Sequence, residues 1–155
     1  MTFRIRGLPA STFQPLFALS DAELARRGAL RVVADRQPGF PCRVSLADAA
    51  PGETLLLLNY EHLPVASPYR SRHAIYVREL AQDARLAVDE VPGVLQTRLL
   101  SVRAFDAAGM MRDAEVVDGG LLADVATRML VDNTVAYLHV HNAKAGCFAA
   151  RIDRA

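Results

Sequence analysis

The sequence predicts an α+β fold with a largely antiparallel sheet of about eight or nine short strands, two or three helices and a closing β-hairpin. Short apolar segments recur along the chain, and turn-forming Pro, Gly, Asn and Asp link them more often than helices do. The chain has 155 residues and is 52% hydrophobic, which is enough for one core without disulfides or a structural metal. We therefore expect a single domain over residues 1–155.

The first part of the chain predicts a strand followed by a helix. Residues 3–8, FRIRGL, alternate apolar and basic side chains as a half-buried strand does. The helix over 20–28 begins with a capping box between Ser20 and Glu23. It ends at Gly28, because glycine adopts the left-handed conformation that closes helices without strain.

The middle of the chain predicts four strands, over 30–35, 42–46, 53–60 and 73–79. The run Leu55 to Leu58 has no polar alternation, so we expect a central strand that is covered on both faces. The Pro-rich loop over 62–72 is long enough to be functional.

The last third predicts a short helix within 88–100 and two strands within 100–117 that turn at 106–109. A second amphipathic helix follows over 118–130. The chain then closes with a hairpin over 136–153.

Composition limits the partners and the compartment. Lys and Arg number 18 against 17 Asp and Glu, so the net charge of +1 argues against a nucleic-acid partner. No segment approaches the roughly 18 apolar residues of a membrane span, and the N-terminus lacks a secretory pattern. We expect a soluble cytoplasmic protein with no membrane partner and with two free thiols.

Strand alternation in the closing hairpin places a set of polar side chains on one face: Tyr137, His139, His141, Cys147 and Arg151. A five-residue loop, NAKAG, keeps the apolar residues of both strands together and pairs His141 directly with Cys147. Side chains opposed in this way lie about 5 Å apart at Cβ. The sequence therefore predicts that the thiol and the imidazoles converge.

Three chemistries fit this face, and the fourth alternative is a solvated sheet face with no chemistry. His141 can activate Cys147 as a nucleophile, with Asn142 or Asp153 as an orienting group. His139 and His141 with Cys147 can hold a transition metal, but no second ligand cluster of recognised spacing is present, so we name no metal ligand. The sequence leaves the identity of any cofactor open. The same face can bind a polar ligand without covalent chemistry.

The segment PYRSRHAIYVR, residues 68–78, carries Arg70, Arg72 and His73 and no acidic residue. Guanidinium groups bind carboxylate and phosphate through two parallel hydrogen bonds, so this loop is suited to an anionic metabolite. The alternative is internal pairing with acidic residues such as Glu61, which surface arginines commonly make.

Polar residues also follow the most apolar strand. NYEHLP places Tyr60 and His62 at the rim of that strand, where polar groups often line a pocket; exit to solvent is the alternative. Cys42 alternates with Val44 and Leu46, which predicts a core thiol.

Five segments carry a resemblance to a known family: GFPCRVSL, LLLLNYEHLP, SPYRSRHAIYVRE, RAFDAAGMM and AYLHVHNAKAGCFAARID. Their combination resembles the uncharacterised bacterial family called domain of unknown function 1203, over nearly the whole chain. The resemblance implies a small bacterial protein that makes up a complete domain. It carries over no catalytic residue.

Together these features predict a domain that binds a small anionic or polar metabolite where the hairpin meets the arginine loop. Arg70 and Arg72 fix the anion, His139 and His141 act as donors or a general base, and Cys147 is the nucleophile of any thiol chemistry. The remaining ligand-binding candidates are His73, Tyr60, His62, Tyr137, Asn142 and Arg151. The competing hypothesis is a non-catalytic interaction or sensor protein that forms a homodimer through exposed edge strands.

Overall fold

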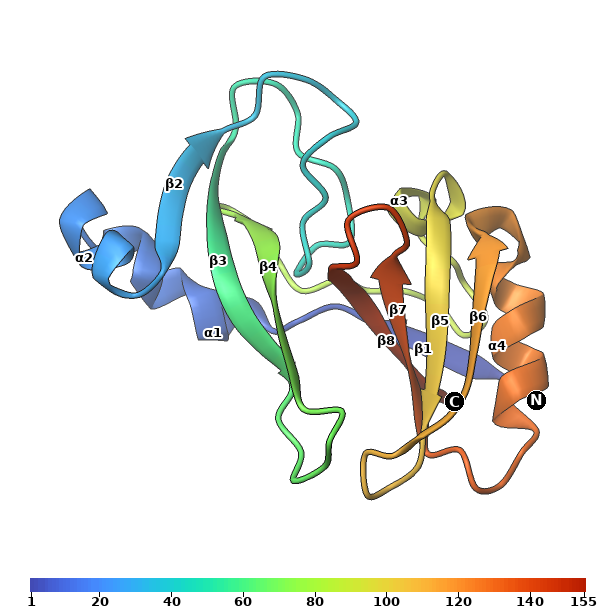
Figure 1. Cartoon of the computed structure of the whole chain (residues 1–155). Helices are drawn as coiled ribbons and strands as arrows, with labels where there is room; N and C mark the ends of the chain where they lie inside the picture. Colours follow the sequence, from blue (N-terminus) through green and yellow to red (C-terminus); the bar gives the residue numbers. More distant parts are fainter.

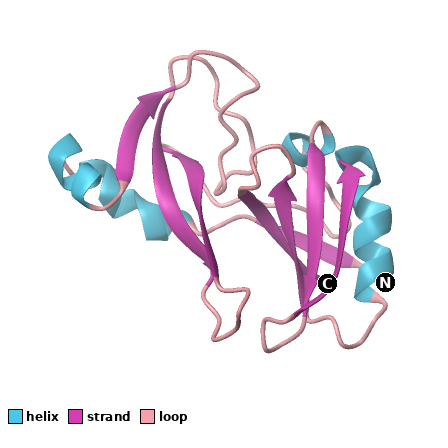
Figure 2. Cartoon of the chain, viewed as in Figure 1, coloured by secondary structure: helices cyan, strands magenta, loops and turns pink.

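The computed structural model describes residues 1–155 and confirms the α+β prediction, with eight strands in two antiparallel sheets (Figures 1 and 2). The five-stranded sheet has the order β1-β8-β7-β5-β6, formed by β1 (Phe3–Arg6), β5 (Leu99–Phe105), β6 (Met111–Asp118), β7 (Tyr137–Asn142) and β8 (Phe148–Arg154). The second sheet has the order β2-β3-β4, formed by β2 (Ala29–Val33), β3 (Thr54–Leu63) and β4 (Ser71–Arg78).

Short helices connect and cover the sheets. They are α1 (Ala10–Phe13), α2 (Asp21–Arg26), α3 (Gly93–Gln96) and α4 (Leu122–Leu130), with 3₁₀ turns η1 (Gln14–Ala18) and η2 (Gly119–Leu121). α2 has the predicted capping box: the Ser20 hydroxyl accepts from the Glu23 N–H at 3.2 Å, and the Glu23 carboxylate accepts from the Ser20 N–H at 2.8 Å. None of the helices combines the length and the apolar character that a membrane span requires.

The two faces of the five-stranded sheet have different surroundings. α4 covers one face (Figure 1), and its apolar side packs with inward residues of the strands to form the largest buried cluster. The opposite face, which carries the histidines of β7, is turned toward the three-stranded sheet. In that second sheet Leu55 and Leu56 of the central strand β3 are fully buried, as predicted.

The predicted strand over 42–46 is wrong. Pro41 and Cys42 form only isolated bridges, and the segment continues in turns to Leu46, which has a left-handed φ of 51°. Alternation misled here because Arg43, which a half-buried strand would expose, is 2% exposed and points into the protein.

The closing hairpin is confirmed, but its register differs from the predicted one. His139 lies opposite Arg151, and the pairing then shifts by one residue so that His141 lies opposite Phe148. The predicted pairing of His141 with Cys147 is therefore wrong. Cys147 lies in the turn that precedes β8.

A β-bulge causes this shift. Ala149 and Ala150 are consecutive, yet both belong to the core that α4 covers, so β8 accommodates one extra residue on that face. Phe148 is thereby turned to the opposite face, where its ring contacts the histidines. Two small side chains make this possible, because alanine fits the core without displacing its neighbours.

The edges of the three-stranded sheet bear on the homodimer hypothesis. β2 is an edge strand, and Leu30 and Val33 on it are 57% and 60% exposed. Unpaired strand edges are templates for association. Homodimer formation stays a prediction.

Two neighbouring glycines test how closely η2 packs on α3. A Cβ on Gly119 would lie 1.8 Å from the Leu95 carbonyl oxygen, whereas a Cβ on Gly120 meets nothing within 4 Å. We expect Gly119→Ala to lower the free energy of unfolding by more than about 2 kcal/mol, because a backbone oxygen must move. Gly120→Ala should change it by less than about 1 kcal/mol. Urea unfolding of both variants measures the difference, and equal effects would contradict the observed packing.

Candidate functional site

A cavity of about 480 Å³ lies where the turn of the closing hairpin meets β4, the loop before Arg43 and the end of α3. We call it the hairpin pocket. Its lining includes the basic side chains Arg43, His73, Arg98 and Lys144, and it includes no aspartate or glutamate. Leu57 and Tyr76 supply part of its apolar wall. The pocket is therefore concave, partly apolar and positive.

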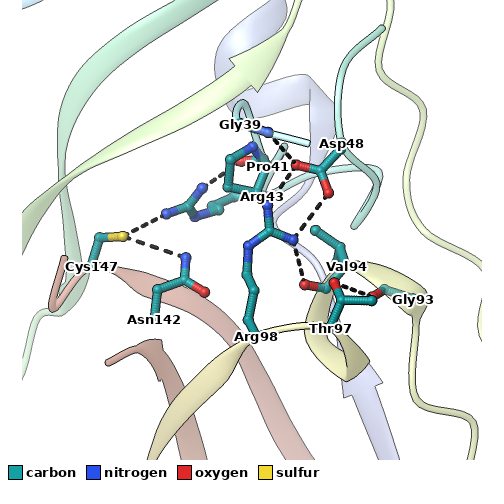
Figure 3. A network of polar contacts seen from close by, with 10 residues as sticks. All are labelled: Gly39, Pro41, Arg43, Asp48, Gly93, Val94, Thr97, Arg98, Asn142 and Cys147. Carbon is teal, nitrogen blue, oxygen red and sulfur yellow. Dashed lines mark hydrogen bonds and ion pairs between the residues drawn. The ribbon is translucent and has the colours of Figure 1, made fainter. Parts of the chain in front are cut away.

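Arg43 is the most deeply buried polar group of this pocket. Its Nε donates to the Phe148 carbonyl oxygen at 2.6 Å. Nη2 donates to the Cys147 sulfur at 3.0 Å, and Nη1 donates to the Pro41 carbonyl oxygen (Figure 3). No carboxylate pairs with it. Burial lowers the pKa of the guanidinium, and the nearby Cys147 sulfur opposes that shift. An arginine nevertheless stays charged in a protein.

Cys147 and Asn142 complete this side of the pocket. Asn142 Nδ2 lies 3.5 Å from the Cys147 sulfur, while Asn142 Oδ1 is buried and has no partner (Figure 3). The Cys147 residue is 9% exposed, and no histidine hydrogen-bonds to its sulfur. His141 lies opposite Phe148 instead of Cys147, so the direct pairing expected to bring the imidazole to the thiol is absent.

Arg98 shapes the opposite wall. Its two Nη atoms bind the two carboxylate oxygens of Asp48 at 3.0 and 2.7 Å, and Nη1 also donates to the Val94 carbonyl at 2.6 Å (Figure 3). This bidentate ion pair joins the loop before β3 to α3 and is largely shielded from solvent. Arg98 therefore has its counter-charge, and Arg43 does not.

Three of the four histidines meet on the other side of β7. His62 near the end of β3 and His139 and His141 of β7 are 9%, 2% and 1% exposed. One ring nitrogen from each lies within 4.8 Å of the others. We call this cluster the histidine triad. His139 and His141 share a face as predicted, and His62 reaches them from the second sheet.

The triad is surrounded by aromatic rings. Phe148 stacks on His62 with ring centroids 5.1 Å apart and lies edge-on to His139 at 4.9 Å. Phe105 packs edge-on against His139 from β5. His141 Nδ1 lies 2.9 Å from the Gly146 carbonyl oxygen, so this nitrogen carries the proton and donates. Nε2 of the same ring is then a lone-pair acceptor.

Burial dominates the protonation of the triad. It lowers the pKa of His62 to about 4, with further lowering by Arg103 and His73. Burial also lowers the pKa of His139 to about 3, helped by the two other triad rings. The pKa of His141 falls to about 3 for the same main reason, although the bond to Gly146 opposes the shift. The three imidazoles are therefore neutral at neutral pH.

Tyr137 and Arg151 lie on the same face as the triad. The Arg151 guanidinium carbon sits 4.0 Å from the centroid of the Tyr137 ring, and the side chain also binds Asp153 at 2.7 Å. Tyr137 packs against His139 with centroids 5.3 Å apart. These two residues border the triad and do not line the hairpin pocket.

The predicted arginine loop does not contribute to the hairpin pocket. Arg70 pairs with Glu61, which is the alternative considered from the sequence, and Arg72 Nε donates to Asn59. Both arginines are exposed. Neither arginine lines the cavity, so the structure does not bring them to the hairpin pocket.

Two other predicted ligand residues lie in different places. His73 of β4 does line the hairpin pocket, and its Nε2 approaches the turn at Gly146. Tyr60 instead packs on Phe13 with ring centroids 5.6 Å apart, and burial raises the pKa of its hydroxyl.

Sequence reasoning missed Arg43 and Arg98 as site residues. Arg43 lies in a segment with apparent strand alternation, which assigned it to the solvent side. The one available signal was its place in the segment that carried the family resemblance. Arg98 gave no signal, because its contact with Asp48 joins residues 50 positions apart in the chain.

Comparison with known families agrees with that resemblance. A family model described as "Protein of unknown function (DUF1203)" matches residues 39–154. The chain belongs to this family. The matched range contains both the hairpin pocket and the histidine triad. Neither the curated proteins nor the solved structures contain a match to the chain.

The lowered pKa values predict a loss of stability in acid. In the unfolded chain a histidine titrates near 6.5, and in the folded chain the triad titrates at about 4, 3 and 3. Above pH 6.5 the triad histidines are neutral in both the folded and the unfolded state, so their protonation does not lower the free energy of unfolding. Below this pH the unfolded state takes up protons first, and the free energy of unfolding falls toward pH 4 by about 1 kcal/mol per pH unit for each histidine.

Urea unfolding between pH 7 and pH 4, with EDTA present so that no metal competes with protons, measures this slope. His139→Phe should reduce the slope by about 1 kcal/mol per pH unit, because one titrating ring is removed. An unchanged slope in that variant would show that His139 titrates normally in the folded protein.

Proposed function

We propose that the chain binds a small anionic metabolite in the hairpin pocket. The observation that carries the proposal is the buried Arg43 guanidinium, which lines the cavity and has no carboxylate partner. Removing an unpaired charge from water costs on the order of several kcal/mol, so an anion from solution is strongly favoured there. The pocket has no acidic side chain to repel it.

The donors that remain free support this role. A guanidinium has five N–H groups, and Arg43 uses three of them on Phe148, Cys147 and Pro41. Two are left for a ligand oxygen. Lys144 on the exposed hairpin turn adds a mobile ammonium group, which suits a phosphate or a carboxylate.

The size and the walls of the pocket limit the ligand. A cavity of about 480 Å³ falls in the range of small-molecule sites. Leu57 and Tyr76 offer apolar surface, so the anionic group is expected to be attached to an organic body. Binding, rather than imidazole-assisted thiol catalysis, is the function this arrangement supports.

Anion binding is tested with inorganic phosphate and succinate as probes, by isothermal titration. Lys144→Ala should weaken binding about fivefold, the effect of removing one exposed charge. Arg72→Ala is the matched control, because it removes the same charge from an exposed position outside the pocket. Failure of both probes to bind, or equal weakening in the two variants, would contradict the proposal.

Cys147 provides an independent chemical test, because its sulfur lines the same pocket. The test compares the alkylation rate of the anionic reagent iodoacetate with that of neutral iodoacetamide. We expect the ratio of the two rates to be about tenfold higher at Cys147 than for glutathione, because a positive cleft concentrates anions. Inorganic phosphate should slow the iodoacetate reaction. Mass spectrometry of the labelled peptides separates Cys147 from Cys42. A rate ratio equal to that of glutathione would count against a positive pocket.

A further inference from the structure

We propose that the histidine triad is a binding site for a late transition-metal ion, of the zinc and copper class, coordinated by His62, His139 and His141. The site lies across the strand β7 from the hairpin pocket and shares no side chain with it. It would connect the two sheets, because His62 belongs to β3 and the other two ligands to β7.

The first support is the arrangement of donor atoms. One nitrogen from each ring lies within 4.8 Å of the others. Nitrogens bound to one tetrahedral zinc ion at 2.0–2.1 Å are about 3.3 Å apart. The nitrogens need to close by up to about 1.5 Å, which side-chain rotations supply. Three convergent imidazoles are also the protein ligands of a known class of zinc site.

The second support is a set of buried nitrogens that have no hydrogen-bond partner. These are Nδ1 of His62, Nδ1 of His139 and Nε2 of His141. A buried polar atom without a partner is unfavourable, and three such atoms in one cluster are unusual. Each ring of the triad therefore has a buried nitrogen whose hydrogen-bonding capacity is unused.

The third support is the hydrogen bond of His141. Its Nδ1–H donates to the Gly146 carbonyl oxygen at 2.9 Å, which fixes the tautomer and leaves the buried Nε2 with a free lone pair. Metal-binding histidines characteristically donate their second nitrogen to a carbonyl or carboxylate in this way. The bond also orients the ring before an ion arrives.

The donor set decides the class of ion. Imidazole nitrogen suits zinc and copper, whereas magnesium and calcium require oxygen ligands. No carboxylate belongs to the cluster. The rings of Phe148 and Phe105 form an apolar shell that strengthens the bonds of the ion to nitrogen by excluding water.

The test is metal titration of the chain after treatment with EDTA and its removal. Co²⁺ reports by its visible absorbance, and Zn²⁺ and Cu⁺ report by competition with chromophoric chelators, the copper under reducing conditions. We expect one ion per chain. His62→Phe and His139→Phe should reduce the bound ion to near zero, and His73→Phe, which changes the only histidine outside the triad, should leave it unchanged.

The variants are chosen so that they fold. Phenylalanine is also a flat aromatic ring, although a larger one, and it removes an unpartnered nitrogen, so we expect these variants to fold. Their thermal midpoints without metal check this. NMR of the unaltered chain gives a second readout: Zn²⁺ should shift the ring signals of the triad histidines and not those of His73. No binding of any of the three ions, binding that His62→Phe retains, or a shift confined to His73 would overturn the proposal.

Discussion

The arrangement of both candidate sites depends on the hydrogen bonds of the buried Arg43 guanidinium. It binds Pro41 in its own loop and both Cys147 and Phe148 at the start of β8, more than 100 residues away in the sequence. Because Nε holds the Phe148 carbonyl, the backbone is fixed just where the bulge begins. The same guanidinium holds the Cys147 sulfur beside the hairpin pocket, one residue before the Phe148 ring that contacts the histidines. Loss of Arg43 would therefore disturb both sides of β7 together.

The bulge explains why one short hairpin serves two separate groups of polar residues. A regular pairing would have put the thiol beside the imidazoles, and the hairpin would have carried a single mixed face. With an extra residue at Ala149, the aromatic ring of Phe148 takes that place and separates the groups. His139 and His141 remain in an apolar, water-poor environment that keeps them neutral. Cys147 remains with Arg43, at a cavity that solvent can enter.

Sequence periodicity was sufficient to predict strands and their faces where the structure is regular. The alternation of β7 correctly placed His139 and His141 on one face, and the apolar run of β3 correctly marked a central strand. It failed at the bulge, because alanine is compatible with either face and nothing in the sequence signals that Ala149 and Ala150 point the same way. Sequence periodicity also could not predict that His62 contacts the histidines of β7. That contact depends on how two sheets pack, whereas periodicity describes one strand at a time.

The distribution of charge gives a reason why these two places, and not others, are suited to ligands. The chain is nearly neutral overall, and most of its arginines that form ion pairs do so at half-buried or exposed positions. Arg98, the best shielded of them, has Asp48. Arg43 is the fully buried exception without an acid, and the triad is the buried cluster whose nitrogens lack partners. A fold that needed only packing would be at least as stable with apolar residues at these positions, because buried polar groups gain little unless they are fully satisfied. Arg43 and the triad nitrogens have hydrogen-bonding capacity that the protein leaves unused. A bound ligand, an anion at Arg43 or a metal ion at the triad, would satisfy it.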